Sequence, residues 1–301
     1  LLPAAKRLAW IKKFPQIVRT GNVQEQQALV QDLTGTSENP YEKELIVHLN
    51  DCLMALHRID PKLLPPIYEV VQAVCEGMQL DLETFNQTNG LTAFQTKHDL
   101  THYCRLMGGK PGLFWSRLIY HVCTVKLARD TFNELGQQVG DALQIVNILR
   151  DLPKDLQNFR CYFPVEQLRQ QSLTPVDLLQ PENTSRFEPI KCYWLYWGHQ
   201  NLQQAICYFK ALPKTQPRIR AAVAWPMLWT ADTYIKLANC PDLLDATKRV
   251  KISRYTIYLT IFLTPFLLGS NALFSCWLTH KLNKLLKTLN QNSPQDKEQK
   301  C

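Results

Sequence analysis

The sequence is poor in glycine, with 11 in 301 residues, and no long run alternates apolar with polar side chains. Strict alternation is the signal of a half-buried strand, so we expect little β structure. The ten cysteines are scattered singly, without a C-x-x-C pair or a Cys/His cluster at the spacing of a zinc site. Isolated cysteines favour reduced thiols and a cytoplasmic protein over a disulfide framework.

Two functional signatures are also absent. No G-x-G-x-x-G run is present, so the chain lacks the phosphate-binding fingerprint of a Rossmann domain. The net charge of +8 is spread along the chain and is not interleaved with aromatic residues on one face, so we expect no nucleic-acid partner. A basic surface of this kind suits anionic substrates and anionic lipid headgroups equally well.

The most informative stretch, residues 140–164, centres on two aspartates. Asp151 and Asp155 form the only D-x-x-x-D spacing in the sequence, and Gln144 and Asn147 precede them. With about 3.6 residues per turn, offsets of three, four and four place all four side chains on one face of a helix. The remaining positions are mostly Leu, Ile and Val, which predicts a buried helix with one polar stripe.

Two interpretations fit this stripe. Buried carboxylates need a compensating positive charge, and carboxylate and amide oxygens are ligands that Mg²⁺ takes together with waters and substrate phosphates. The stripe therefore indicates a magnesium–diphosphate site. Alternatively, it is a solvated face on which Asp151 and Asp155 pair with Arg150 and Lys154.

Two further features bear on helix geometry. Gly108, Gly109 and Gly112 are dense enough to weaken a helix. They predict either a simple turn between helices or a break where backbones approach closely, with room for a substrate chain. Pro153 lies between the two aspartates and removes one backbone hydrogen bond, so we expect it to bend the helix or to end it early.

Residues 143–164 resemble the second aspartate-rich motif of the squalene and phytoene synthase family, which reads L-Q-x-x-N-I-x-R-D-x-x-x-D followed by R-x-Y-x-P. The agreement holds in register at Leu143, Gln144, Asn147, Ile148, Arg150, Asp151, Asp155, Arg160, Tyr162 and Pro164. The resemblance extends from about Leu1 to Tyr258 and is strongest to bacterial squalene synthase-like members. It implies an all-α isoprenoid synthase fold, in which a helical bundle surrounds a central apolar cavity.

Residue roles come from the same resemblance. Tyr103, in a Y-C segment similar to one of the family, falls on a tyrosine implicated in proton transfer or cation stabilisation, and Asp151 and Asp155 complete the catalytic set. Asn147, Asp151 and Asp155 are the implied Mg²⁺ ligands. The residues implied to bind diphosphate are Gln144, Asn147, Arg150, Arg160, Tyr162, Tyr234 and Arg249. For Arg249, a plain surface charge in the basic run KRVKISR is the alternative.

The family joins two allylic prenyl diphosphates head to head. One diphosphate ionises with Mg²⁺, and the double bond of the second substrate attacks the cation to give a cyclopropylcarbinyl diphosphate. A second ionisation and rearrangement gives squalene, with hydride from NADPH, or a phytoene-type polyene without it. We expect two farnesyl diphosphates to give squalene via presqualene diphosphate, and phytoene or dehydrosqualene synthesis is the alternative. The sequence leaves substrate chain length and NADPH use open.

Other classes of protein also stay open. One is a non-catalytic, degenerate paralogue of the family, and another is a small integral membrane protein. A head-to-tail prenyltransferase of the same fold is disfavoured by Arg160, Tyr162 and Pro164. We expect a monomer whose partners are prenyl diphosphates and, at its surface, a membrane.

The first aspartate-rich motif of the family, of the D-T-x-x-D kind, has no match in residues 1–60. Residues 1–10 instead resemble the segment just after that motif, and the chain begins with Leu without a signal-peptide pattern. We therefore expect a processed chain or a fragment that starts just downstream of the motif and carries half of the metal site. The 301-residue polypeptide is accordingly predicted to be inactive or nearly so, and the full-length protein to be a synthase.

Residues 255–279 contain no charged side chain and are flanked by the basic runs KRVKISR and HKLNKLLK. This length meets the threshold of about 20 residues for a transmembrane helix, although Pro265, Ser270 and Asn271 weaken the pattern. We therefore divide the chain into a synthase domain over 1–254, a hydrophobic helix over 255–289 that spans or dips into a membrane, and a disordered tail over 290–301. The expected location is cytoplasmic, either peripheral to the membrane or anchored there by the C-terminal helix.

Overall fold

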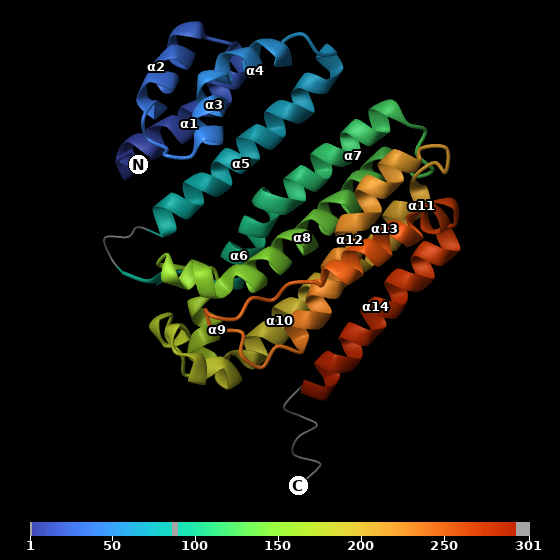
Figure 1. Ribbon diagram of the computed structural model, residues 1–301. Coiled ribbons are helices and arrows are strands. Elements are labelled where there is room, and N and C mark those ends of the chain that lie inside the picture. Colours follow the sequence, from blue (N-terminus) through green and yellow to red (C-terminus); the bar gives the residue numbers. More distant parts are fainter. Residues whose placement is uncertain (1, 86–89, 293–301) are drawn as a thin grey trace. The chain divides into compact units, whose positions relative to one another are not determined.

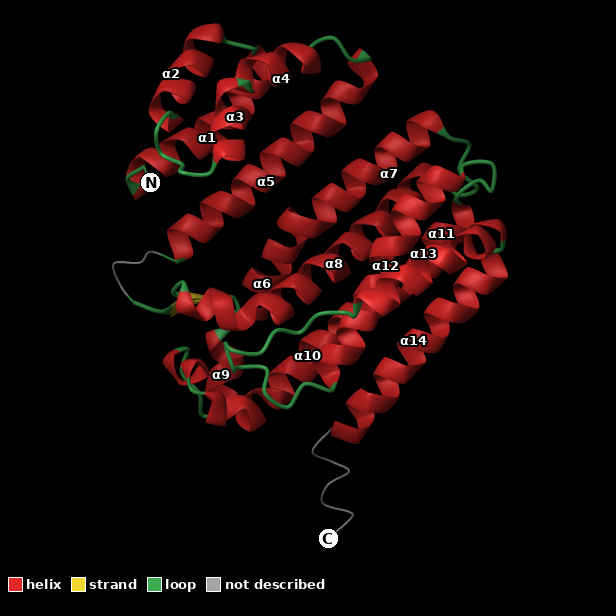
Figure 2. Cartoon of the chain, in the orientation of Figure 1, coloured by secondary structure: helices red, strands yellow, loops and turns green. Residues whose placement is uncertain are grey.

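The computed structural model describes residues 2–85 and 90–292, and these residues are almost entirely helical (Figures 1 and 2). The described part of the chain holds just two short strands, so the predicted all-α fold is confirmed. The contacts divide the chain into two compact units, Leu1–Glu83 and Thr84–Cys301, and this boundary lies inside the domain predicted over residues 1–254.

The first unit is a set of amphipathic helices around a small core. Its elements are α1 (Ala4–Thr20), α2 (Val23–Leu33), α3 (Pro40–Val47), α4 (Leu49–Leu56), the 3-10 turn η1 (Pro61–Leu63) and α5 (Leu64–Thr84). Gly21 ends α1 in the left-handed conformation, and the Asn22 side chain accepts hydrogen bonds from the first backbone N–H groups of α2. Ile17, Leu29 and Leu53 form the buried centre, so three of these helices share one core.

The second unit contains the predicted site. Its elements are β1 (Thr92–Ala93), α6 (Lys97–Cys104), the π-helical turn η3 (Arg105–Gly109), α7 (Lys110–Val122), α8 (Arg129–Gln157), β2 (Arg160–Cys161), α9 (Val165–Gln170), η4 (Val176–Leu179), η5 (Pro181–Asn183), α10 (Thr184–Gln203), α11 (Ala205–Ala211), α12 (Pro217–Ala238), α13 (Arg254–Gly269) and α14 (Asn271–Asn292). Helix α8 is central and packs against α7, α10, α11 and α12 (Figure 1). Strands β1 and β2 pair in parallel, with Thr92 opposite Arg160.

Helix α8 runs for 29 residues and continues to Gln157, four residues beyond Pro153. The prediction that Pro153 ends the helix early is therefore wrong. Leu149, Leu152 and Leu156 on either side of the proline are each at most 2% exposed. Their burial holds both ends of the interrupted segment against the core, which offsets the single hydrogen bond that the proline removes.

The glycines that follow Tyr103 do not form a turn. The backbone stays helical from α6 through η3 into α7, and the glycines instead meet glycines of α8. A Cβ atom on Gly108 would lie 2.3 Å from the carbonyl oxygen of Gly140, and one on Gly112 would lie 2.2 Å from that of Gly136. Of the two alternatives, close backbone approach is confirmed, although it occurs without a helix break.

The C-terminal hydrophobic segment is two helices, α13 and α14, with an extended residue, Ser270, between them. The predicted single helix over 255–289 is therefore wrong. The buried guanidinium of Arg220 holds the corner, because it donates to the Leu268 carbonyl oxygen at 2.8 Å and to Asn271 Oδ1 at 2.7 Å. None of the described helices combines the length and apolar character that crossing a bilayer requires. Helix α14 extends to Asn292, so the first residues of the tail predicted to be disordered are helical, and residues 293–301 lie outside the described residues.

Candidate active site

Three cavities of different chemistry surround α8, and Asn147 lines all of them. The smallest, which we call the polar cavity, has a volume of about 210 Å³. Its lining residues are Tyr103, Gln144, Asn147, Ile148, Asp151, Lys154, Asp155 and Tyr162. The four polar residues predicted to share one helix face thus line one cavity, and each is only partly exposed.

Two tyrosines form the aromatic end of the polar cavity. Tyr103, on α6, and Tyr162, just after β2, are each 6% exposed and stack with their ring centroids 5.0 Å apart. The Tyr103 hydroxyl donates to the Tyr162 hydroxyl at 3.4 Å. The parallel β1–β2 pair fixes this arrangement, since Phe94 follows β1 and packs against both tyrosines. Aromatic faces attract a neighbouring cation, so this end suits a developing carbocation.

The aspartates are the second feature of the polar cavity. Asp151 accepts two hydrogen bonds from its neighbour Arg150, at 3.0 Å from Nε and 2.6 Å from Nη2. These bonds raise the pKa of Arg150 above its ordinary value. The alternative interpretation paired Asp151 and Asp155 with Arg150 and Lys154, and the Arg150–Asp151 pair is present in the structure. Both side chains are more than a third exposed, so the pair itself contributes little to stability.

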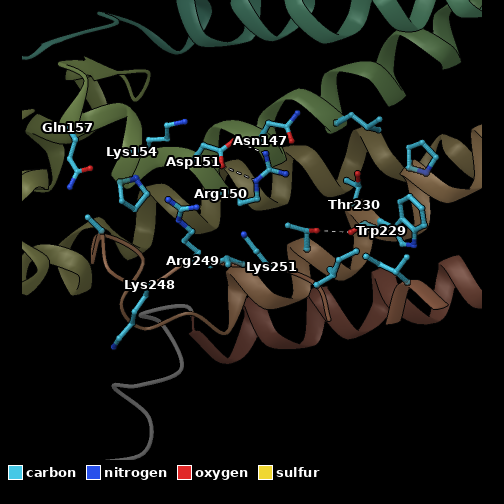
Figure 3. Close-up of a pocket in the computed structure, with 18 of the residues that line it drawn as sticks. Asn147, Arg150, Asp151, Lys154, Gln157, Trp229, Thr230, Lys248, Arg249 and Lys251 are labelled. Atoms are coloured by element: carbon cyan, nitrogen blue, oxygen red, sulfur yellow. Dashed lines mark hydrogen bonds and ion pairs between the residues drawn. The ribbon is translucent and has the colours of Figure 1, made fainter. Parts of the chain in front are cut away.

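The largest cavity, which we call the basic cavity, has a volume of about 910 Å³ (Figure 3). Its walls come from α8, α12 and the segment between α12 and α13. The charged residues among its lining are Arg150, Asp151, Lys154, Lys248, Arg249 and Lys251. Cations outnumber the carboxylate, which gives the cavity a positive potential suited to a phosphate-bearing ligand. Arg249 lines the cavity from the wall opposite α8 (Figure 3). It is also an exposed residue, so its role in binding diphosphate stays a prediction beside the alternative of a surface charge.

The segment that carries Arg249 is fixed by local hydrogen bonds. The Asp245 carboxylate accepts from the backbone N–H of Thr247 at 2.9 Å and from its hydroxyl at 2.7 Å, and these bonds lower the pKa of Asp245. Lys236, on α12, donates to the Lys251 carbonyl oxygen at 2.6 Å. The cationic side chains are thus presented on an ordered segment even though it forms no helix.

The third cavity, which we call the apolar cavity, has a volume of about 330 Å³ and lies where α7 and α8 touch. Gly108, Gly112, Gly136 and Gly140 line it, and facing backbone or side-chain atoms fill the positions where their Cβ atoms would lie. The larger lining side chains include Met107, Trp115, Val139, Leu143, Tyr208, Val223 and Met227. An extended apolar ligand group fits this lining.

Two residues predicted to bind diphosphate are not at these cavities. Tyr234 is fully buried, and its hydroxyl donates to the Ala142 carbonyl oxygen at 2.6 Å. Burial also raises the pKa of Tyr234 well above its ordinary value, so this tyrosine is a core residue. Arg160 forms part of β2 and does not line any of the three cavities. The structure therefore does not support the predicted role of either residue.

One buried acidic residue was missed. Asp141, on α8, is fully buried and forms an ion pair with Arg105, whose Nη2 lies 2.7 Å from Oδ2. Burial raises the pKa of Asp141 to about 6, although Arg105 opposes this shift. Asp141 lies three residues before Gln144, so continuing the polar stripe by one turn towards the N-terminus would have found it. The ion pair ties η3 to α8 beside the close glycine contacts.

The donors of the polar cavity suit a shared magnesium ion. Asn147, Asp151 and Asp155 offer one amide and two carboxylates, and Mg²⁺ is commonly held by one or two carboxylates together with waters and substrate phosphates. Within residues 2–85 and 90–292, no group of three or more His, Cys, Asp or Glu side chains could hold a metal by itself. The amide and the two carboxylates would leave positions on such an ion for waters and a phosphate ligand.

Comparison with known proteins identifies the family of the chain. A family model described as squalene/phytoene synthase matches residues 15–256. The chain belongs to this family. Phytoene synthase 2 of Zea mays is 25% identical over 197 residues, covering 64% of this chain and 44% of the maize protein. Squalene synthase ERG9 of Saccharomyces cerevisiae is 30% identical over 155 residues, covering 50% of this chain and 33% of the yeast protein.

The fold comparison covers more of the chain. A structure of TcSQS with the ligand BPH1237 has a TM-score of 0.72 at 15% sequence identity and covers 97% of this chain and 85% of that one. The family and the isoprenoid synthase fold are therefore confirmed. The chain matches between 22% and 56% of the length of the relatives compared with it. The maize and yeast relatives are not bacterial, so the resemblance to bacterial squalene synthase-like members stays a prediction.

Proposed function

We propose that the chain binds prenyl diphosphates at α8 and belongs to an enzyme that joins two of them head to head. The observation that carries this proposal is the meeting of the three cavities at Asn147. A prenyl diphosphate has an anionic head and a long apolar chain, and the basic and apolar cavities match these two parts. Squalene and phytoene synthases among the relatives support the same first half-reaction, with farnesyl diphosphate as the expected substrate for squalene.

The chain's own residues have separate roles in this proposal. Arg150 and Arg249 bind and orient the diphosphate oxygens. Tyr103 and Tyr162 face the reacting carbon and stabilise positive charge there, while the apolar cavity keeps out the water that would quench it. Asn147, Asp151 and Asp155 are the proposed holders of Mg²⁺, which neutralises the leaving diphosphate when bound.

A second candidate is a non-catalytic prenyl diphosphate-binding protein. It is favoured by the Arg150–Asp151 ion pair, which occupies one of the proposed Mg²⁺ ligands. Binding of a prenyl diphosphate is common to both candidates, so it tests the site more directly than turnover does.

The binding experiment is isothermal titration of the 301-residue chain with farnesyl diphosphate, farnesol and inorganic diphosphate, each with and without Mg²⁺. We expect farnesyl diphosphate to bind more tightly than either fragment, because it fills both the basic and the apolar cavity. Arg249→Gln should weaken its binding by about tenfold or more, since one hydrogen bond to a charged group is worth about 1.5–3 kcal/mol. Arg218→Gln, an exposed arginine on α12 outside the cavities, is the matched control.

The metal contribution is tested in the same titration. Asp155→Asn should abolish the increase in affinity that Mg²⁺ produces, whereas Asp130→Asn, at the exposed start of α8, should leave it unchanged. Equal effects of Arg249→Gln and Arg218→Gln would contradict the site. Mass analysis of products with and without NADPH then separates squalene synthesis from phytoene-type synthesis, and tight binding without product supports the non-catalytic candidate.

A further inference from the structure

Helix α13 buries polar side chains and exposes aromatic ones. Thr260 is 1% exposed and Thr264 9%, whereas Phe262 is 74% exposed and Phe266 64%. The inward threonines are bonded, because Thr264 Oγ1 accepts a hydrogen bond from Trp225 Nε1 at 2.8 Å. The outward orientation of the phenylalanines is thus fixed by the packing of α13 against α12.

The exposed side chains form one continuous surface. Tyr255, Tyr258, Phe262 and Phe266 follow one another at offsets of three, four and four, which places them on one side of the helix. All four are more than half exposed. We call them the aromatic face of α13. An exposed apolar surface of this kind marks an interaction site, because soluble proteins seldom leave contiguous aromatic patches in water.

The charge around the aromatic face is of one sign. Residues 246–292 contain no aspartate or glutamate, and their basic residues are Lys248, Arg249, Lys251, Arg254, Lys281, Lys284 and Lys287. Lys251 and Arg254 are exposed and immediately precede the aromatic face. A second copy of the chain would bring no carboxylate from this segment to pair with them. An anionic lipid surface, in contrast, complements both the aromatic rings and the cations.

We propose that the aromatic face of α13 docks the protein on an anionic lipid bilayer, with the helix lying in the plane of the interface. The 16-residue helix is too short to span the bilayer but long enough to lie on it for about 24 Å. Its two tyrosines have polar tips suited to the headgroup layer, and its two phenylalanines suit the acyl boundary. Ile257 of the same helix lines the basic cavity, so a docked bilayer would lie beside that cavity.

The test is co-sedimentation of the 301-residue chain with vesicles, without any substrate, so its result does not depend on the proposed reaction. Equimolar phosphatidylglycerol and phosphatidylcholine vesicles should bind the protein, and phosphatidylcholine vesicles should bind it weakly. The double substitution Phe262→Ser and Phe266→Ser should lower binding at least about tenfold, because it removes the two phenylalanine rings that would enter the bilayer. Tyr41→Ser, which removes an aromatic side chain that is 84% exposed elsewhere, is the matched control and should bind normally.

The charge contribution is tested separately. Arg254→Gln should lower binding to the anionic vesicles about fivefold, and Lys214→Gln, an exposed lysine beyond residues 246–292, should have little effect. Circular dichroism and the thermal midpoint should show that every variant is folded. Unchanged vesicle binding by the double phenylalanine variant, or no binding by the original chain, would overturn the proposal. The proposal would equally be overturned if the original chain formed a dimer and bound no lipid, and if the double phenylalanine variant were a monomer. That result would assign the aromatic face to a second copy of the chain.

Discussion

Helices α8 and α13 lie in the same unit but bury different kinds of side chain. The buried residues of α8 are mostly Leu, Ile, Val and small residues, and its polar stripe points into cavities. In α13, two of the three buried residues are threonines, and the aromatic side chains point outward. Burial of apolar surface stabilises the first helix in the fold. The second helix leaves apolar surface available for a partner, so the presence of apolar residues alone does not distinguish a core helix from a docking helix.

The largest expected difference between α8 and α13 is in how much a substitution on each helix lowers the stability of the fold. Leu149→Ala, at a fully buried position of α8, should lower the free energy of unfolding by about 2–5 kcal/mol through lost burial and the resulting void. Phe262→Ala removes a larger side chain from α13 but should change stability by no more than about 0.5 kcal/mol, because the ring is 74% exposed. Urea denaturation of both variants measures the difference. Similar losses for the two substitutions would mean that the α13 ring is buried in solution.

A second contrast concerns glycine. A Cβ atom on Gly140 of α8 would lie 2.1 Å from the Gly108 carbonyl oxygen, whereas one on Gly269, at the end of α13, meets nothing within 4 Å. Gly140→Ala should therefore destabilise the protein by about 3 kcal/mol or more, since backbone must move. Gly269→Ala should be neutral or slightly stabilising, because it restricts the unfolded chain. Thermal unfolding distinguishes them, and a tolerated Gly140→Ala would contradict the close contact of η3 with α8.

These two contrasts also show how far the sequence reaches. The polar stripe of α8 was predictable because four residues on one helix obey a fixed angular spacing, which no tertiary contact alters. Tyr234 was misplaced because a motif position does not reveal which neighbouring helix a side chain meets, and here it meets α8 through the Ala142 carbonyl. The break at Ser270 depends on Arg220, some fifty residues earlier in the chain, and the local pattern therefore read as one long helix.

The cavities were predictable only in part. Asn147 and Asp151 belong to a recognisable motif, but the basic cavity also needs the segment around Arg249, and only tertiary folding brings the two together. The glycine pattern indicated close backbone approach without naming α8 as the partner helix. Likewise, the uncharged stretch of residues 255–279 shows its exposed aromatic face only once Thr260 and Thr264 are seen to point inward.

The buried carboxylate of Asp141 predicts a pH dependence that α13, without a titratable buried group, should lack. Burial raises its pKa from the ordinary 3.8 to about 6 in the folded protein, so the folded state binds the proton more tightly than the unfolded state. Its contribution to stability is therefore greatest below pH 4 and is lost as the pH rises to 6, by about 3 kcal/mol in total.

Asp141→Asn removes this titration. The free energy of unfolding of the variant, relative to the original chain, should therefore increase by about 3 kcal/mol between pH 4 and pH 7. Urea denaturation at several pH values measures this, and the substitution Asp130→Asn at the exposed start of α8 provides the control. A relative stability that does not change with pH would mean that Asp141 keeps an ordinary pKa in the folded state.

The smallest expected effect tests whether the inward threonines orient α13. Thr264→Val keeps the shape of the side chain but leaves the Trp225 indole N–H without its acceptor, which should cost about 1–2 kcal/mol of stability. Combining it with Trp225→Phe removes both partners, and the pair should then cost less than the sum of the single substitutions. Additive losses in this double-mutant cycle would show that the hydrogen bond does not hold α13 in place, and the outward orientation of Phe262 and Phe266 would then need another cause.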